Sequence, residues 1–107
     1  MWRTLEDINQ LEKISQESFE KPVAIFKHST RCGISRMVLR NFEGEIKSKD
    51  SVNTELYFLD LIANRDISNE IASKFDITHE SPQLIIIKDG KAIFDVSHHG
   101  ISADNIS

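Results

Sequence analysis

The chain has 107 residues, of which 39% are hydrophobic and 28% charged, and its formal net charge is −4. This length and composition are typical of one globular domain, which we place over residues 1–107. The acidic balance argues against a general nucleic-acid-binding role, and no apolar run reaches the ~20 residues that a membrane span needs. The first residues lack the basic start and apolar core of a signal peptide, so the expected compartment is the cytoplasm.

The first expected element is a helix that begins at Thr4, where a threonine N-cap precedes an acidic residue three positions on. This helix should end near Ser18, ahead of Pro22. Residues 23–28 form an almost wholly apolar run, which is the pattern of a strand buried on both faces. The apolar residues that recur at helical spacing along the first helix are Leu5, Ile8, Leu11, Ile14 and Phe19.

A second helix is predicted after residues 29–33. Residues 56–61 indicate another buried strand, and a third helix should begin near Asn64 or Asp66. The apolar stripe expected on the second helix consists of Ile34, Met37, Val38, Phe42 and Ile46.

The last part of the chain predicts a β-hairpin. Pro82 opens an apolar run at residues 83–88, residues 89–90 (Asp-Gly) favour a tight turn, and residues 91–96 form the returning strand. A short tail from Ser102 is expected to form one helical turn.

The predicted order of elements is α-β-α-β-α-β-β. Strands that alternate with helices indicate parallel pairing through right-handed crossovers, and the closing hairpin adds an antiparallel edge. The sequence therefore predicts an α/β domain in which a four-stranded mixed sheet is flanked by helices on both faces.

Cys32 is the chain's single cysteine and is expected where the first buried strand gives way to the second helix. One cysteine cannot form a disulfide within the chain, and it excludes a cysteine-based zinc or iron–sulfur site within one chain. A helix N-terminus carries unpaired N–H groups and about half a positive charge, which stabilise a thiolate. This position favours a reactive thiolate at Cys32; the structural alternative is an inert buried cysteine.

The charges around the cysteine are unevenly distributed. Residues 21–42 contain five basic residues and no acid, so this stretch carries +5 while the rest of the chain carries −9. Lys27, Arg31 and Arg36 lie close enough to Cys32 in sequence to reinforce the stabilisation of a thiolate. The alternative is that these residues form an ordinary solvated helix face.

Ser35 stands three residues after Cys32, where a Cys-x-x-Cys motif carries its resolving thiol. A hydroxyl at this position can hydrogen-bond to the thiolate but cannot form a disulfide; alternatively, Ser35 only begins the helix. The predicted chemistry is therefore monothiol, because an adduct on Cys32 must be removed by an external thiol. Pro82, which follows Ser81, lies at the first position of a buried strand, where a proline is tolerated.

Residues 30–35 (TRCGIS), taken with residues 79–83 (HESPQ), resemble the monothiol bacilliredoxin family of thioredoxin-like proteins, which are associated with bacteria that use bacillithiol. The resemblance spans nearly the whole chain. Gly33 replaces the proline that family members commonly carry after the cysteine, whereas the following Ile-Ser is present. The short ending after Ile101 leaves little room for a final helix over that face of the sheet.

The resemblance implies a thioredoxin-like fold in which the Ser81–Pro82 bond is cis and its loop faces the cysteine. It implies reduction of protein–bacillithiol mixed disulfides by the Cys32 thiolate, with bacillithiol as co-substrate and no bound cofactor. S-bacillithiolated proteins are the expected partners, and a monomer is expected. The implied site consists of Cys32 as nucleophile, Thr30, Gly33, Ile34 and Ser35 supporting the thiolate, and Arg31, Arg36, Ser81 and Pro82 binding substrate.

Two other functions stay open. The first is a glutaredoxin-like monothiol reductase that uses glutathione or coenzyme A, which substrate assays would separate. The second is a non-catalytic redox sensor or interaction module whose Cys32 is thiolated without turnover. Catalytic turnover by substoichiometric protein would exclude this second function.

Overall fold

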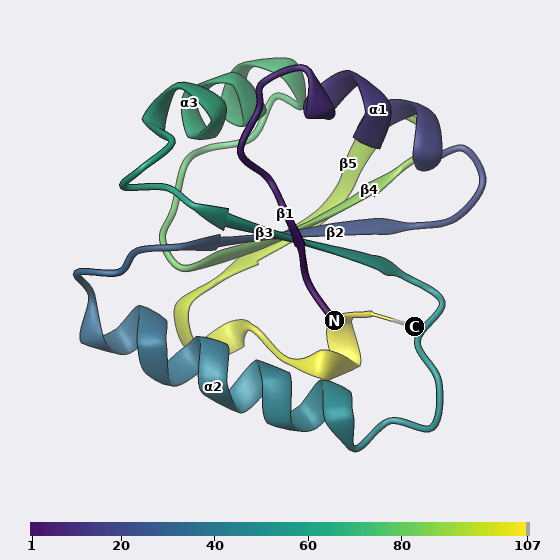
Figure 1. Ribbon diagram of the computed structural model, residues 1–107. Coiled ribbons are helices and arrows are strands. Elements are labelled where there is room, and N and C mark those ends of the chain that lie inside the picture. The colour runs from purple at the N-terminus through teal and green to yellow at the C-terminus, as the bar shows by residue number, and fades with distance from the viewer. Residues whose placement is uncertain (107) are drawn as a thin grey trace.

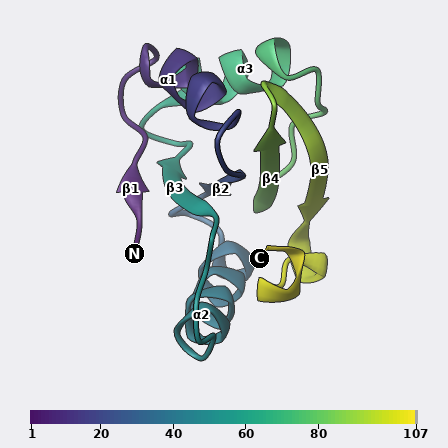
Figure 2. The same cartoon turned by 90° about the vertical axis from the view of Figure 1, so that its right-hand side faces the viewer.

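The computed structural model describes residues 1–106, which form a five-stranded sheet between two layers of helices (Figure 1). Helices α1 and α3 cover one face of the sheet, while α2 and the C-terminal tail cover the other (Figure 2). The elements are β1 (Arg3–Thr4), α1 (Gln10–Glu17), β2 (Val23–His28), α2 (Gly33–Lys47), β3 (Glu55–Asp60), α3 (Arg65–Lys74), β4 (Gln83–Lys88) and β5 (Lys91–Ser97), followed by the 3-10 turns η1 (His98–Gly100) and η2 (Ala103–Asn105).

The strand order is β1-β3-β2-β4-β5, with β1, β3 and β2 parallel and the β4–β5 hairpin antiparallel. The predicted α/β class, the mixed sheet and the closing hairpin are confirmed. Four strands were predicted, and this number is one too low, because β1 pairs in parallel with β3 through Arg3 and Thr4.

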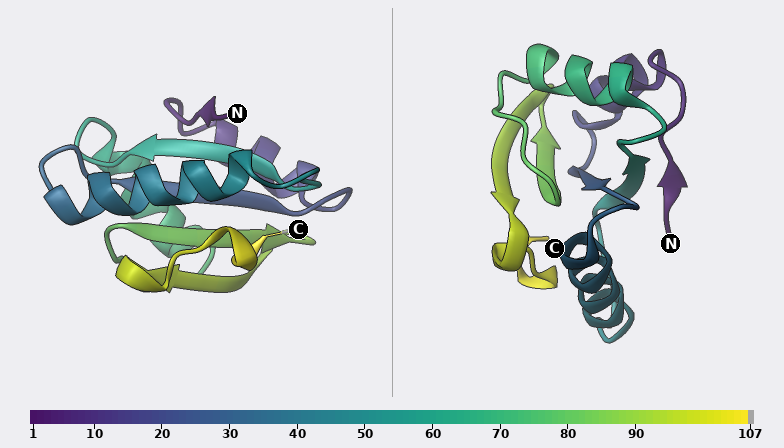
Figure 3. Two further views of the ribbon diagram at one scale, coloured as in Figure 1. Left: turned by 90° about the horizontal axis from the view of Figure 1, so that it is seen from below. Right: turned by 90° about the vertical axis from the view of Figure 1, so that its left-hand side faces the viewer.

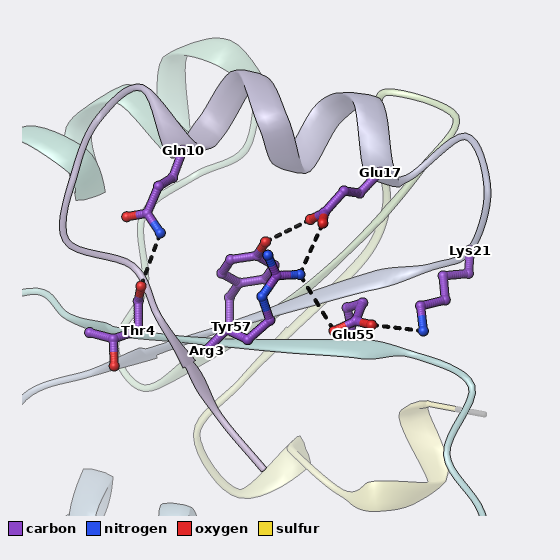
Figure 4. Close-up of polar contacts among 7 residues, drawn as sticks. All are labelled: Arg3, Thr4, Gln10, Glu17, Lys21, Glu55 and Tyr57. Carbon is purple, nitrogen blue, oxygen red and sulfur yellow. Dashed lines mark hydrogen bonds and ion pairs between the residues drawn. The ribbon is translucent and has the colours of Figure 1, made fainter.

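The segment that was predicted to begin the first helix at Thr4 is instead extended. The Leu5 N–H donates to the Phe58 carbonyl at 2.9 Å, which continues the strand ladder. The Gln10 side chain then organises the turn before α1: its Oε1 accepts from the N–H of Glu6, and its Nε2 donates to the Thr4 carbonyl (Figure 4). Side-chain bonding by Gln10 therefore replaces the expected threonine cap.

Strand β2 is buried over its whole length, as predicted. Successive residues alternate between the two faces of a strand, so Val23 and Ile25 pack with α1 and α3 whereas Ala24 and Phe26 pack with α2. Two apolar cores thus meet at this strand, and the turn that follows it is placed by both.

Part of the apolar stripe predicted on α2 is wrong. Its buried residues are Ser35, Val38, Phe42 and Ile46. Ile34 and Met37 are 45% and 46% exposed, because they lie beside this line and point away from the sheet. In the α1 region Ile8 and Phe19 are also exposed, since both lie outside the helix, which ends as predicted near Ser18.

The C-terminal tail packs on the α2 face of the sheet. Ile101, Ala103 and Ile106 are buried in the core on that side, and the tail lies beside α2 (Figure 3). The predicted helical turn after Ser102 is present as η2, where the Ser102 hydroxyl accepts from the Asp104 N–H at 3.1 Å. Apolar residues of a short irregular segment therefore complete part of the core on this face.

A polar network joins β1, α1 and β3 (Figure 4). The Tyr57 hydroxyl donates to Glu17 Oε1 at 2.6 Å, and Arg3 donates to Glu17 Oε2 at 2.9 Å while its guanidinium lies 4.6 Å from the centre of the Tyr57 ring. Burial opposes ionisation of Glu17, but these two hydrogen bonds hold the pKa of its carboxyl below the usual value. Burial and the bond to Glu17 raise the pKa of Tyr57.

Replacing Tyr57 by phenylalanine tests this network. Tyr57→Phe leaves a partly buried carboxylate oxygen without its donor, so we expect a loss of about 1–3 kcal/mol in the free energy of unfolding. The matched control is Lys21→Ala, which removes a more exposed ion pair with Glu55 (2.7 Å) and should cost about 1 kcal/mol or less. Urea denaturation measures both, and equal losses would contradict the ranking.

Candidate functional site

Cys32 lies where the sequence predicts it, between the end of β2 and the beginning of α2. It occupies the N-cap position of α2 with extended backbone angles (φ −109°, ψ 119°). Its N–H donates to the Ser29 carbonyl and its carbonyl accepts from the Arg36 N–H, both at 3.2 Å. The cysteine is unpaired and half-buried. The strand end and the first helical turn therefore hold the thiol at a helix N-terminus, within reach of solvent.

Ser35 is wholly buried, and its hydroxyl is engaged away from the thiol. Its Oγ lies 2.8 Å from His28 Nδ1 and accepts from the Ser29 N–H at 3.1 Å. The hydroxyl is thus engaged with His28 and with the backbone before the cysteine, and burial lowers the pKa of His28. Within residues 1–106 no hydrogen bond joins Ser35 to Cys32, and the support of the thiolate by Ser35 stays a prediction. Ser35 holds the turn that precedes the cysteine.

The second predicted motif lies at the same edge of the sheet. The Ser81–Pro82 peptide bond is cis, as predicted. Because Lys27 pairs with Gln83 across β2 and β4, Pro82 follows the loop that faces the end of β2, where the turn to Cys32 begins. The Pro82 carbonyl accepts from the His98 N–H at 3.0 Å, and within residues 1–106 the buried Ser81 Oγ has no hydrogen-bond partner.

The surface around Cys32 combines basic and apolar side chains. Arg31, Arg36 and Ile34 are exposed, and Arg36 Nη1 folds back to donate to the Thr30 carbonyl at 3.2 Å. A Cβ added at Gly33 would meet only the tip of Arg36, at 3.9 Å, so a larger residue fits there. The described residues enclose no pocket, and this candidate site is an open surface.

Two further properties of residues 1–106 bear on the possible classes of function. None of the helices is long and apolar enough to cross a bilayer. Over the same residues, no three side chains of histidine, cysteine, aspartate or glutamate are grouped so that they would hold a metal ion.

One contact at this edge of the sheet, between Lys27 and His79, was not predicted from the sequence. Lys27 was expected beside the thiol, but strand alternation directs it to the face opposite α2, where it is wholly buried. Its Nζ donates to His79 Nδ1 at 2.6 Å, and Ser68 Oγ lies 3.5 Å from the same nitrogen. Burial lowers the pKa of Lys27 to about 8, and burial together with the lysine's charge lowers the pKa of His79. The alternation of side chains between the two faces of β2 could have predicted that Lys27 lies on the face opposite α2.

The low pKa of Lys27 predicts a specific dependence of stability on pH. The folded value of about 8 lies below the ordinary value of 10.5, so the unfolded chain binds more protons between these two values. The resulting destabilisation, about 3 kcal/mol, is fully present below pH 8 and is relieved as the pH rises towards 10.5. Lys27→Met should therefore be more stable than the parent at pH 7, with a difference that shrinks at pH 9.5.

Urea denaturation at a series of pH values measures this difference. The matched control is Lys91→Met, because Lys91 is an exposed residue of β5. A stability difference for Lys27→Met that stays constant from pH 7 to pH 9.5, or that equals the control's, would contradict the prediction.

Comparison with known proteins agrees with this geometry. A candidate oxidoreductase with a thioredoxin fold is 31% identical with a TM-score of 0.79, over 94% of this chain and 86% of that one. Thioredoxin from Fasciola hepatica is 25% identical (TM-score 0.68; 90% and 86% covered). Thioredoxin Mala s 13 from Malassezia sympodialis, at 18% identity, shares the fold (TM-score 0.76; 98% and 84% covered). The family model of monothiol bacilliredoxin BrxC matches residues 3–106, and this chain therefore belongs to the monothiol bacilliredoxin family.

Proposed function

We propose that this protein reduces mixed disulfides between proteins and bacillithiol, with Cys32 as the nucleophile. The observation that carries the proposal is the position of Cys32, a half-buried thiol at the N-cap of α2 in a chain of the bacilliredoxin family. The N-cap position places the sulfur at the beginning of a helix and within reach of solvent, where it can attack a disulfide of another molecule.

The proposed reaction has two exchange steps. In the first, the Cys32 thiolate attacks the bacillithiol sulfur of the mixed disulfide; the S–S bond breaks, and the target leaves as a thiolate that takes up a proton from solvent. In the second, the thiolate of another bacillithiol attacks the bacillithiol sulfur on Cys32 and releases the Cys32 thiolate. The products are a reduced thiol on the target protein and bacillithiol disulfide. The Cys32 thiolate is regenerated, so the bacilliredoxin itself is unchanged after one cycle.

The exposed residues around Cys32 suit such a substrate. Bacillithiol carries malate carboxylates, for which Arg31 is the first candidate partner because it adjoins Cys32 and its guanidinium is exposed. Arg36 is a second candidate, since its hydrogen bond to the Thr30 carbonyl uses one of its five N–H donors. The backbone of Ser81 is proposed to pair with an extended segment of the target protein.

Intact-mass spectrometry tests the transfer directly. The reduced protein is mixed with a bacillithiolated target and, separately, with a glutathionylated one, and Cys32→Ser serves as the control. We expect bacillithiol to appear on Cys32 as the target is freed, in preference to glutathione and not in the control. Preference for glutathione would favour the glutaredoxin-like reductase, and an adduct without turnover would favour the sensor; either result contradicts the proposal.

Ser35→Cys tests why the reaction is monothiol. The position is buried beside His28 on the first turn of α2, three residues after Cys32. The introduced thiol should attack the adduct on Cys32, release bacillithiol and leave an intramolecular disulfide. Mass spectrometry after the first exchange step, with no free bacillithiol added, should therefore find a disulfide in this variant and a bacillithiol adduct in the parent. A persistent adduct in Ser35→Cys would show that position 35 is not a resolving position.

A further inference from the structure

The loop before β4 is held from inside the sheet by two buried polar side chains. Lys27 and Gln83 are neighbours across β2 and β4, and both are wholly buried. Gln83 Nε2 donates to the Thr78 carbonyl at 3.0 Å, and its Oε1 accepts from the Glu80 N–H at 3.2 Å. Lys27 donates to the residue between these two, His79, at 2.6 Å. Three consecutive loop residues, 78–80, are thus hydrogen-bonded to the paired side chains of Lys27 and Gln83.

A lysine at position 27 is unfavourable for the stability of the fold. Within residues 1–106 no carboxylate lies within ion-pair distance of its ammonium, and its one hydrogen-bond partner is the imidazole of His79. An unpaired buried charge destabilises a fold, and an apolar residue of similar length would not carry this penalty. The contact with His79 is therefore better explained by what the loop does than by stability.

We propose that the Lys27–His79 contact holds the loop of residues 78–82 in its substrate-binding position, which makes Lys27 a positioning residue for the exchange reaction. This inference rests on the proposed function, in which the backbone of Ser81 pairs with the target. Lys27 and its partner act on target binding, while the reactivity of the thiol itself is set at the N-terminus of α2, on the opposite face of β2.

The contact is also sensitive to acid. The charged groups that face His79 are Lys27 from β2, Arg65 from α3 and Glu80 from its own loop. Protonation of His79 removes the acceptor at Nδ1 and places a second cation against the Lys27 ammonium, with a single carboxylate nearby to offset it. Target binding should therefore weaken as the pH falls below the ordinary imidazole value of 6.5.

Steady-state kinetics with a bacillithiolated protein separates binding from chemistry. Lys27→Met and His79→Leu should raise KM about tenfold, the factor expected from one hydrogen bond to a charged group, with kcat unchanged. His79→Asn keeps an acceptor near the position of Nδ1 and should recover most of the lost affinity, without the rise in KM at acidic pH. Lys91→Met, on the exposed strand β5, is the matched control for Lys27→Met.

Two measurements without substrate distinguish failure of this inference from failure of the proposed function. The rate of Cys32 alkylation by iodoacetamide should be equal in all variants, and hydrogen exchange at the Glu80 N–H should be faster in Lys27→Met and His79→Leu. If the parent does not act on bacillithiolated proteins, the proposed function fails. Hydrogen exchange at the Glu80 N–H then still tests whether the Lys27–His79 contact holds the loop. Unchanged exchange at Glu80, equal KM in all variants or a changed alkylation rate in Lys27→Met would each overturn the inference.

Discussion

The antiparallel pairing of β4 with β2 is the constraint on which the rest of the site depends. Its register places Gln83 opposite Lys27, so the loop that ends in the cis Ser81–Pro82 bond lies at the sheet edge from which the chain turns towards Cys32. These two segments are about fifty residues apart in sequence. Without the pairing, a thiol at a helix N-terminus would have no backbone beside it against which a target could be aligned.

The side chains at the end of β2 alternate between the two faces of the sheet and make polar contacts on both. Its last residue, His28, faces α2 and bonds to the buried Ser35 hydroxyl, which fixes the turn before Cys32. The preceding residue, Lys27, faces the other way and bonds to His79 in the loop. Two adjacent polar residues, buried in an otherwise apolar strand, therefore position the two halves of the site independently of each other.

The local patterns of the sequence predicted the fold well because each depends on neighbouring residues. The hairpin at Asp89 and Gly90 and the strand-to-helix turn at Cys32 are where they were expected. The errors arose where distant contacts decide. Thr4 resembles a helix cap, yet pairing with β3 makes it a strand. The contact of the Ser35 hydroxyl with His28 was likewise not predicted, because no local pattern reveals it.

Ser35 and Lys27 together indicate how this site divides its tasks. A cysteine at position 35 would be buried against His28, a base suited to take its proton, whereas a serine there gives the same turn a hydrogen bond and no redox chemistry. In the proposed reaction, release of the adduct is therefore left to a second molecule, which must reach Cys32 from solvent. An open surface suits such an exchange, because both the protein target and the second thiol need access to the same sulfur. On such an open surface, the inferred reaction depends on a well-positioned loop to align the target. That loop is where the fold keeps a buried lysine without an ion-pair partner in contact with His79.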